Sequence, residues 1–233
     1  MDPLAPLLEL PEVAPAVSAA VTEVDRAMPR RPGAGLAVEV ALRSAVASAA
    51  LEGHRYDVEQ VRAGLVTDPV LQGALRVAGE LDRLAPRWTV APGQVLARLH
   101  VLAARGVVEP DALGRPAVAS PRLETLMTLV AARGSPAPAL VRAAVVHGEL
   151  LALRAFAGPN GVVARAAGRL TLIAAGLDPR ALLPVEVGHL AREPEYVGSA
   201  GAFATGTPDG VRSWLRHCAA AASAAATELG LLV

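Results

Sequence analysis

The sequence contains no lysine, so every permanent side-chain cation is an arginine. The basic residues number 22 and the acidic residues also number 22, which gives a formal net charge of zero at pH 7. Proteins that bind nucleic acid or anionic lipid usually carry an excess of positive charge on one face. We therefore expect neither a nucleic-acid partner nor a membrane partner.

Cysteine is almost absent too. The single residue, Cys218, excludes a disulfide framework within the chain and favours a reducing, cytoplasmic location. We interpret Cys218 as a small buried hydrophobe in an alanine-rich helix. The N-terminal stretch "MDPLAPLLELPEVAP" lacks the basic region of a signal peptide, and the run "LTLIAAGL" is too short to cross a bilayer.

Aromatic residues make up only 3% of the chain, whereas hydrophobic residues reach 53%, largely through alanine. Sheets favour aromatic and β-branched residues, and helices favour alanine. We therefore predict an all-α fold. Proline and glycine punctuation places the main helices at about 14–28, 36–53, 57–66, 68–85, 91–108, 121–134, 138–156, 162–177 and 208–230, with one or two short helices before the last.

The segment 107–120 shows short valine-containing runs and turn residues instead of a helical period, and we predict a small β-hairpin flap there. Residues 1–35 form a proline-marked lead-in and a first helix. Residues 36–233 then form one helical domain, with its core at about 91–218.

The stretch 153–165, "LRAFAGPNGVVAR", places a Gly-Pro-rich loop before an apolar helix. Free N–H groups at a helix N-terminus attract anions, and Gly158 and Gly161 allow a ligand to approach the backbone. Asn160 tolerates a left-handed conformation. The alternative is a tight turn between two helices that binds nothing.

Arg165 falls in the first turns of that helix, where the helix dipole disfavours a cation. It therefore needs an anionic partner unless it is simply solvated. Ser48 and Glu52 in "SAALEG" lie four residues apart, on one face of an upstream helix with few charges. We expect Glu52 to pair with Arg165; the alternative is a solvated glutamate at a helix end.

The order of these features resembles the Fic (Fido) family of nucleotide-transferring proteins, whose motif is HPFxDGNGRxxR between two helices. In "RAFAGPNGVVAR" the residues Phe156, Asn160, Gly161 and Arg165 match the motif. "SAALEG" fits the family's inhibitory pattern Ser/Thr-x-x-x-Glu-Gly/Asn, which makes 36–53 an inhibitory-type helix. The resemblance spans about 36–218 and implies a Fic-like helical domain.

Four positions depart from the motif. The family's catalytic histidine corresponds to Arg154, and a guanidinium cannot accept a proton from a target hydroxyl. The magnesium-holding acid corresponds to Gly158, which argues against a bound Mg²⁺. The motif's first arginine, a phosphate contact, corresponds to Val162, and its first loop glycine to Pro159.

The resemblance leaves two functions open. The first is a catalytically impaired regulator that binds ATP, another nucleotide, a phosphate ligand or a protein partner. Its anion site would comprise Arg154, Gly158, Asn160, Gly161 and Arg165, and Ser48 and Glu52 would act as a staple on Arg165. The alternative is an active protein adenylyltransferase, or a related phosphate-group transferase, with an altered mechanism. DNA binding by a helix-turn-helix is less favoured because the net charge is zero.

Other histidines could in principle replace the lost base, but we do not expect them to. His100 and His147 match core positions of the family's helices, and we expect both to be packed in the interior. His54 follows Gly53, where a solvated loop histidine is the simpler interpretation. His189 and His217 show no ligand spacing, so we predict no metal site. The oligomeric state stays open.

Overall fold

Helices form the whole framework in the computed structural model, which describes residues 2–117, 120–132 and 134–233. The α-helices are α1 (Val13–Ala27), α2 (Leu36–Ala50), α3 (Val58–Arg62), α4 (Pro69–Ala78), α5 (Leu81–Trp88), α6 (Pro92–Ala104), α7 (Pro121–Ala131), α8 (Ala139–Leu153), α9 (Asn160–Ala174), α10 (Val185–Ala191), α11 (Glu193–Ala204) and α12 (Pro208–Leu232). Two 3-10 helices, η1 (Ala5–Glu9) and η2 (Pro110–Ala112), complete the set in these ranges. The predicted all-α class is confirmed.

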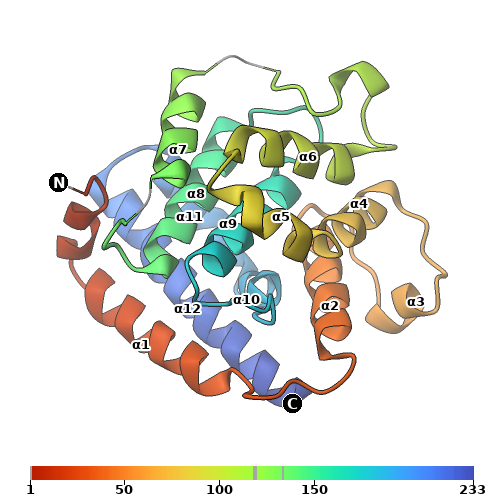
Figure 1. Cartoon of the computed structure of the whole chain (residues 1–233), viewed down its shortest axis with the longest axis horizontal. Coiled ribbons are helices and arrows are strands. Elements are labelled where there is room, and N and C mark those ends of the chain that lie inside the picture. Colours follow the sequence, from red (N-terminus) through yellow and green to blue (C-terminus); the bar gives the residue numbers. More distant parts are fainter. Residues whose placement is uncertain (1, 118–119, 133) are drawn as a thin grey trace.

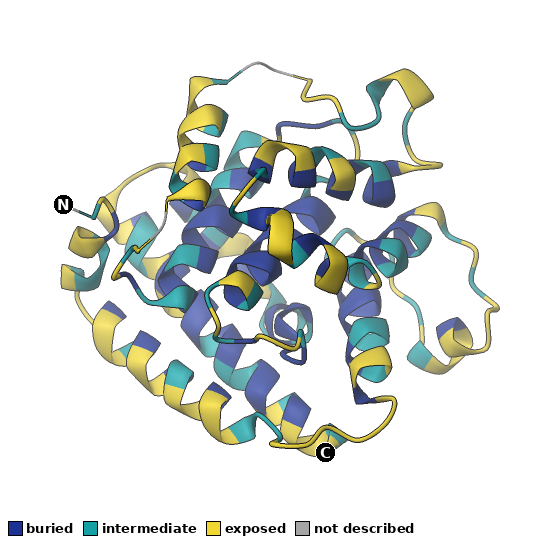
Figure 2. Ribbon diagram, in the orientation of Figure 1, coloured by how far each residue is buried: buried dark blue, intermediate teal, exposed yellow. Residues whose placement is uncertain are grey.

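Helix α9 lies at the centre of the molecule (Figures 1 and 2). Every residue from Gly161 to Leu172 is buried, so this helix is covered on all sides. Its small and aliphatic residues allow close packing, and its two buried arginines, Arg165 and Arg169, need polar partners from neighbouring segments. Its neighbours are α8, α5, α6, α2 and α4. The candidate loop 154–159 therefore leads directly into the most enclosed helix of the fold.

A second layer surrounds α12, which packs against α1, α10, α11 and α8 (Figure 1). The apolar residues Val13, Val17 and Val24 of α1 join the same core cluster as those of α12. Gly188 of α10 lies against the carbonyl oxygen of Ala221, where an added Cβ would overlap that oxygen. Glycine at this position lets α10 approach α12 closely.

The predicted helix at 68–85 is wrong as a single unit. Asp68 caps the start of α4 as expected, accepting from the Leu71 N–H at 2.8 Å. Helix α4 then ends at Ala78, and the glycine at 79 caps it. The new helix α5 turns to pack against α9. The sequence pattern missed this because the apolar residues of both pieces keep a helical period across the break.

The predicted β-hairpin at 107–120 is not found in the described part of that segment. An isolated bridge joins Arg105 and Val108, and η2 and turns follow it. Residues 118–119 lie outside the described ranges. The segment is instead held by side chains, as the Gly114 N–H donates to His100 Nδ1 at 2.9 Å. Valine-containing runs this short can be held by such contacts without a ladder of backbone hydrogen bonds.

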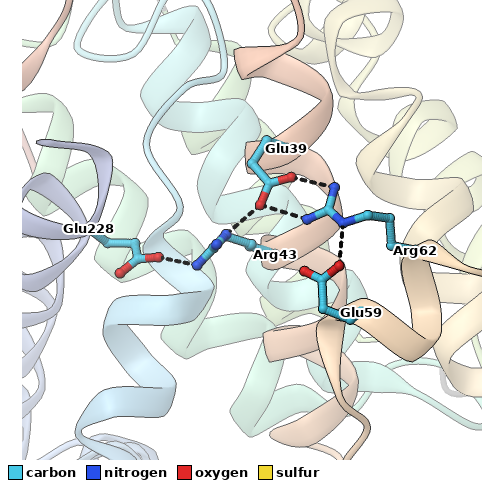
Figure 3. A network of polar contacts seen from close by, with 5 residues as sticks. All are labelled: Glu39, Arg43, Glu59, Arg62 and Glu228. Atoms are coloured by element: carbon cyan, nitrogen blue, oxygen red, sulfur yellow. Dashed lines mark hydrogen bonds and ion pairs between the residues drawn. The ribbon is translucent and has the colours of Figure 1, made fainter. Parts of the chain in front are cut away.

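Helix α2 is held at its N-terminal half by ion pairs, which Figure 3 shows in close-up. Glu39 accepts from Arg43 Nε at 2.6 Å and pairs with Arg62 Nη1 of α3 at 2.7 Å. Arg43 also bonds Glu228 of α12 at 2.8 Å. These pairs lower the pKa of Glu39 to about 2, chiefly through the Arg62 and Arg43 hydrogen bonds. The network fixes the helix that carries Ser48 and that leads into the turn with Glu52.

Candidate functional site

The loop between α8 and α9 is shaped by its own polar groups. Arg154 ends α8 in a left-handed conformation (φ 45°, ψ 48°), and its side chain is exposed. The side chain of Asn160 closes the loop, because Oδ1 accepts from the Phe156 N–H at 3.0 Å and Nδ2 donates to the Phe156 carbonyl at 2.6 Å. Asn160 thus makes the structural bonds of a turn.

Gly158 fits its place because it has no side chain. Its φ is +77°, a conformation that glycine adopts without strain. A Cβ added there would lie 2.8 Å from Val108 Cγ1 of the segment that follows α6. The position at which the resemblance implies a magnesium-holding acid therefore lies against an apolar wall. The residues present do not fit a bound Mg²⁺.

His100 of α6 ties this loop to the neighbouring segment. Because the Gly114 N–H donates to Nδ1, the proton of the neutral ring is on Nε2, which donates to the Ala157 carbonyl at 2.8 Å. The ring stacks on Phe156 with centroids 4.6 Å apart. Burial lowers the pKa of His100, which favours this neutral form. The sequence placed His100 in the core, but its bridging role depends on contacts that spacing does not reveal.

Arg165 is the most tightly held side chain near the loop. Its Nε donates to Ser48 Oγ at 3.0 Å and its Nη2 to the Ser48 carbonyl at 2.8 Å. Nη2 also donates to Glu52 Oε1 at 2.8 Å, and Nη1 donates to the Tyr196 hydroxyl at 3.0 Å. The side chain of Arg165 is 1% exposed and that of Glu52 is 23% exposed. The structure thus brings together the three residues that the sequence analysis grouped as a staple.

Glu52 also covers the N-terminus of α9. A Cβ added to Gly161 would overlap Glu52 Oε1, and it would lie 2.9 Å from Arg165 Nη1. The carboxylate therefore occupies the space directly over the first turn of the motif helix. A helix N-terminus favours negative charge, and here the chain supplies that charge itself. The anion site implied by the loop is filled from within.

Tyr196 extends this network into the interior. Since Arg165 can only donate, the Tyr196 hydroxyl proton is free to donate to His147 Nε2, 3.1 Å away. Burial and the charge of Arg165 lower the pKa of His147 well below its usual value. Burial by itself would lower the pKa of Arg165. Tyr196 and Glu52 outweigh this effect and hold the pKa of Arg165 above its usual value. A neutral histidine therefore lies behind a charged guanidinium.

The other residues considered in the sequence analysis are buried or hydrogen-bonded within the fold. His147 and Cys218 are buried, and His54 bonds Asp68 at 2.9 Å instead of facing solvent alone. Among the described residues, no group of three or more His, Cys, Asp or Glu side chains is placed to hold a metal ion. Within the same ranges, no helix combines the length and apolar character needed to cross a bilayer.

Solved structures share this fold. A Fic family protein from Desulfovibrio desulfuricans G20 matches with a TM-score of 0.70 and 25% identity, over 92% of this chain and 74% of that chain. Fic-1 from C. elegans matches with a TM-score of 0.74 and 18% identity, over 93% of this chain and 71% of the other. The chain has a Fic fold.

Comparison of the amino-acid sequence, without the structure, does not identify the fold. No family model matches the chain, and no curated protein matches it. The Fic fold is therefore recognised from the folded geometry. Arg154 and Gly158, the two positions at which the resemblance implies a histidine and an acid, both have positive φ in the turn between α8 and α9.

Two contributors to this Fic-fold site were missed by the sequence analysis. Nothing in the spacing of Tyr196 shows that it contacts Arg165. Val108 was assigned to a hairpin, although it forms the wall against Gly158. Both contacts join residues far apart in the chain, so only the folded geometry reveals them.

Proposed function

We propose that this Fic-fold protein does not transfer nucleotides and acts through binding, as a regulator whose motif site is closed by its own glutamate. The observation that carries this proposal is the position of Glu52 Oε1 over Gly161, bonded to Arg165. The loop provides a guanidinium at 154 where the resemblance implies a base. General-base help is typically a 10²–10⁴-fold effect, so its loss is severe.

The ligand that suits this site is a nucleotide or another phosphate compound, admitted only when Glu52 withdraws. Withdrawal would leave the first-turn N–H groups of α9 and the Arg165 guanidinium facing the same space. Both are donors that favour a phosphate oxygen. With Glu52 in place, the surface of the loop is available to a protein partner instead.

Calorimetric titration with ATP tests the proposal. The unaltered protein is expected to show no binding heat, and Glu52→Gly is expected to bind because its carboxylate no longer covers Gly161. Glu52→Gln is the matched control, since it keeps the bulk and removes the charge. Equal affinity in the unaltered protein and Glu52→Gly would contradict closure by Glu52. Silence of all three would leave a protein partner as the ligand.

A further inference from the structure

A second hollow lies between α1, α11 and α12, and none of its lining residues belongs to the motif loop. Its volume is about 670 Å³, within the usual size range of small-molecule sites. Three arginines line it against a single carboxylate: Arg192, Arg212, Arg216 and Glu195. We call it the arginine pocket. The lining therefore carries an excess of positive charge, although the chain as a whole has no net charge.

Arg192 is held by Glu195 through two hydrogen bonds of 3.0 and 2.9 Å, whereas the two arginines of α12 are paired with exposed acids outside the lining. Arg212 contacts Asp209 at 3.2 Å, and that aspartate side chain is 89% exposed. Arg216 contacts Glu12 at 2.6 Å, and that glutamate is 63% exposed. Exposed pairs of this kind are weak, so their donors can turn to a better acceptor. Neither of these two acids lines the arginine pocket.

The floor of the arginine pocket carries an unpaired buried nitrogen. The side chain of His217 is 2% exposed, and its Nδ1 has no hydrogen-bond partner among the described residues. Glu195 Oε2 lies 3.9 Å away, beyond hydrogen-bond range. His217 Nε2 is engaged by His189 Nδ1 at 3.0 Å, so only Nδ1 is left for a ligand. A buried polar nitrogen of this kind normally has a partner.

The lining also restricts the class of ligand. His217 is the only residue with an aromatic ring among the described lining residues, and its Nε2 is hydrogen-bonded to His189. The lining therefore offers no aromatic platform for stacking a nucleobase. Arg212 and Arg216 lie four residues apart on one face of α12, and the Ser213 hydroxyl lies between them in the chain. Guanidinium groups bind carboxylate and phosphate oxygens with paired hydrogen bonds.

We propose that the arginine pocket binds a compact polyvalent oxyanion, a diphosphate or a polycarboxylate, between Arg212, Arg216 and the Nδ1–H of His217. Burial lowers the pKa of His217 to about 4 and keeps the ring neutral at pH 7. In the tautomer in which His189 donates to Nε2, the His217 proton is on Nδ1 and points to the ligand. The site is independent of the motif loop and of its closure by Glu52.

Calorimetry with inorganic pyrophosphate and with citrate tests the site. We expect one of these probes to bind the unaltered protein, and the double variant Arg212→Gln/Arg216→Gln to lose about tenfold or more in affinity. Arg83→Gln is the matched control, because Arg83 also belongs to an exposed pair with an acid three residues away. Absence of binding by both probes, or full binding by the double variant, would overturn the proposal.

NMR of the histidine imidazole rings tests whether the anion binds at His217. Saturating probe is expected to shift the His217 Nδ1 resonance and to raise the pKa of that ring, while His54 in its separate contact with Asp68 stays unchanged. Glu52→Gly is expected to bind the probe as the unaltered protein does, which separates this site from the motif loop. Binding that depends on Glu52 and leaves His217 unaffected would assign the anion to α9 and refute the arginine pocket.

Discussion

At the scale of single residues, Glu52 has the largest consequence. Its carboxylate bonds Arg165 and covers Gly161, so it neutralises a buried cation and occupies the N-terminus of α9. Removing it would leave the guanidinium bonded only to Ser48 and Tyr196. A charged group that loses its counter-ion in the interior destabilises the folded state.

We expect Glu52→Ala to lower the free energy of unfolding by about 1–3 kcal/mol, less than for a fully enclosed pair because the glutamate is partly exposed. Urea denaturation measures the change. Glu59→Ala is the control, since the Glu59 side chain is 73% exposed. If both variants have the same stability as the unaltered protein, the staple contributes nothing.

Gly158 offers a second residue-scale test. Gly158→Asp would restore the acid that the resemblance implies, but it would place a Cβ against Val108. We expect a loss of stability about 1 kcal/mol larger than for Gly64→Asp, which has a similar φ of 72° and open space around it. Thermal or urea unfolding of the two variants gives the comparison. Equal losses would show that Val108 does not constrain the loop.

At the scale of elements, α2 is held at both ends of its length. Its N-terminal half bonds α3 and α12 through Glu39 and Arg43 (Figure 3). At its C-terminal end Ser48 bonds α9, as does Glu52 in the turn that follows. A helix fixed at two places does not move easily as a gate. Withdrawal of Glu52 from Gly161 therefore requires movement of the Glu52 side chain and of the turn after Ala50, and not of α2.

Low pH should weaken the ion pairs of Glu39, which hold the N-terminal half of α2. The pKa of Glu39 is about 2 in the folded protein, below its usual value of 4.5, so its stabilising effect is full above pH 4.5 and is lost as the pH falls toward 2. We expect the stability difference between the unaltered protein and Glu39→Gln to shrink over that window in urea titrations. A difference that stays constant with pH would contradict the ion-pair network. Glu23→Gln, on an exposed position of α1, is the control.

The sequence predicted most of these elements because the helices are long and proline or glycine marks their ends. Asp57 and Asp68 cap α3 and α4, and aspartate is a residue type that favours helix starts. The break near Gly79 and the irregular segment after α6 were not predicted. Both depend on packing against distant helices and on His100, whose two hydrogen bonds join Gly114 and Ala157. The pairing of Glu52 with Arg165 was anticipated because an uncompensated cation at a helix start requires an acid.

At the scale of the whole molecule, three buried histidines connect the layers around Tyr196. His147, His189 and His217 come from α8, α10 and α12, and their rings pack within about 5–6 Å of Tyr196. Burial lowers the pKa of each; nearby Arg165 further lowers those of His147 and His189. Folding therefore keeps all three neutral where the unfolded chain would bind protons.

This cluster predicts a loss of stability in mild acid. Each histidine has a folded pKa below the unfolded value of 6.5, so its contribution is full above pH 6.5 and falls as the pH drops from 6.5 toward 4. The three together should lower the free energy of unfolding by about 2–4 kcal/mol between pH 7.5 and pH 5.5. Urea unfolding at the two pH values checks this, and His217→Gln should show a smaller difference. A stability that is constant across this range would contradict neutral burial.

The central claim is that the Fic fold is retained here without nucleotide transfer, with the motif site closed by Glu52. The most direct measurement is incubation with ATP labelled on the α-phosphate and Mg²⁺, using the unaltered protein and Glu52→Gly, each alone and with cell lysate. Glu52→Gly/Arg165→Ala serves as the control for contaminating activity. The account predicts no attached adenylate in any sample. Labelling that appears with Glu52→Gly and disappears in the double variant would show that transfer survives and would contradict it.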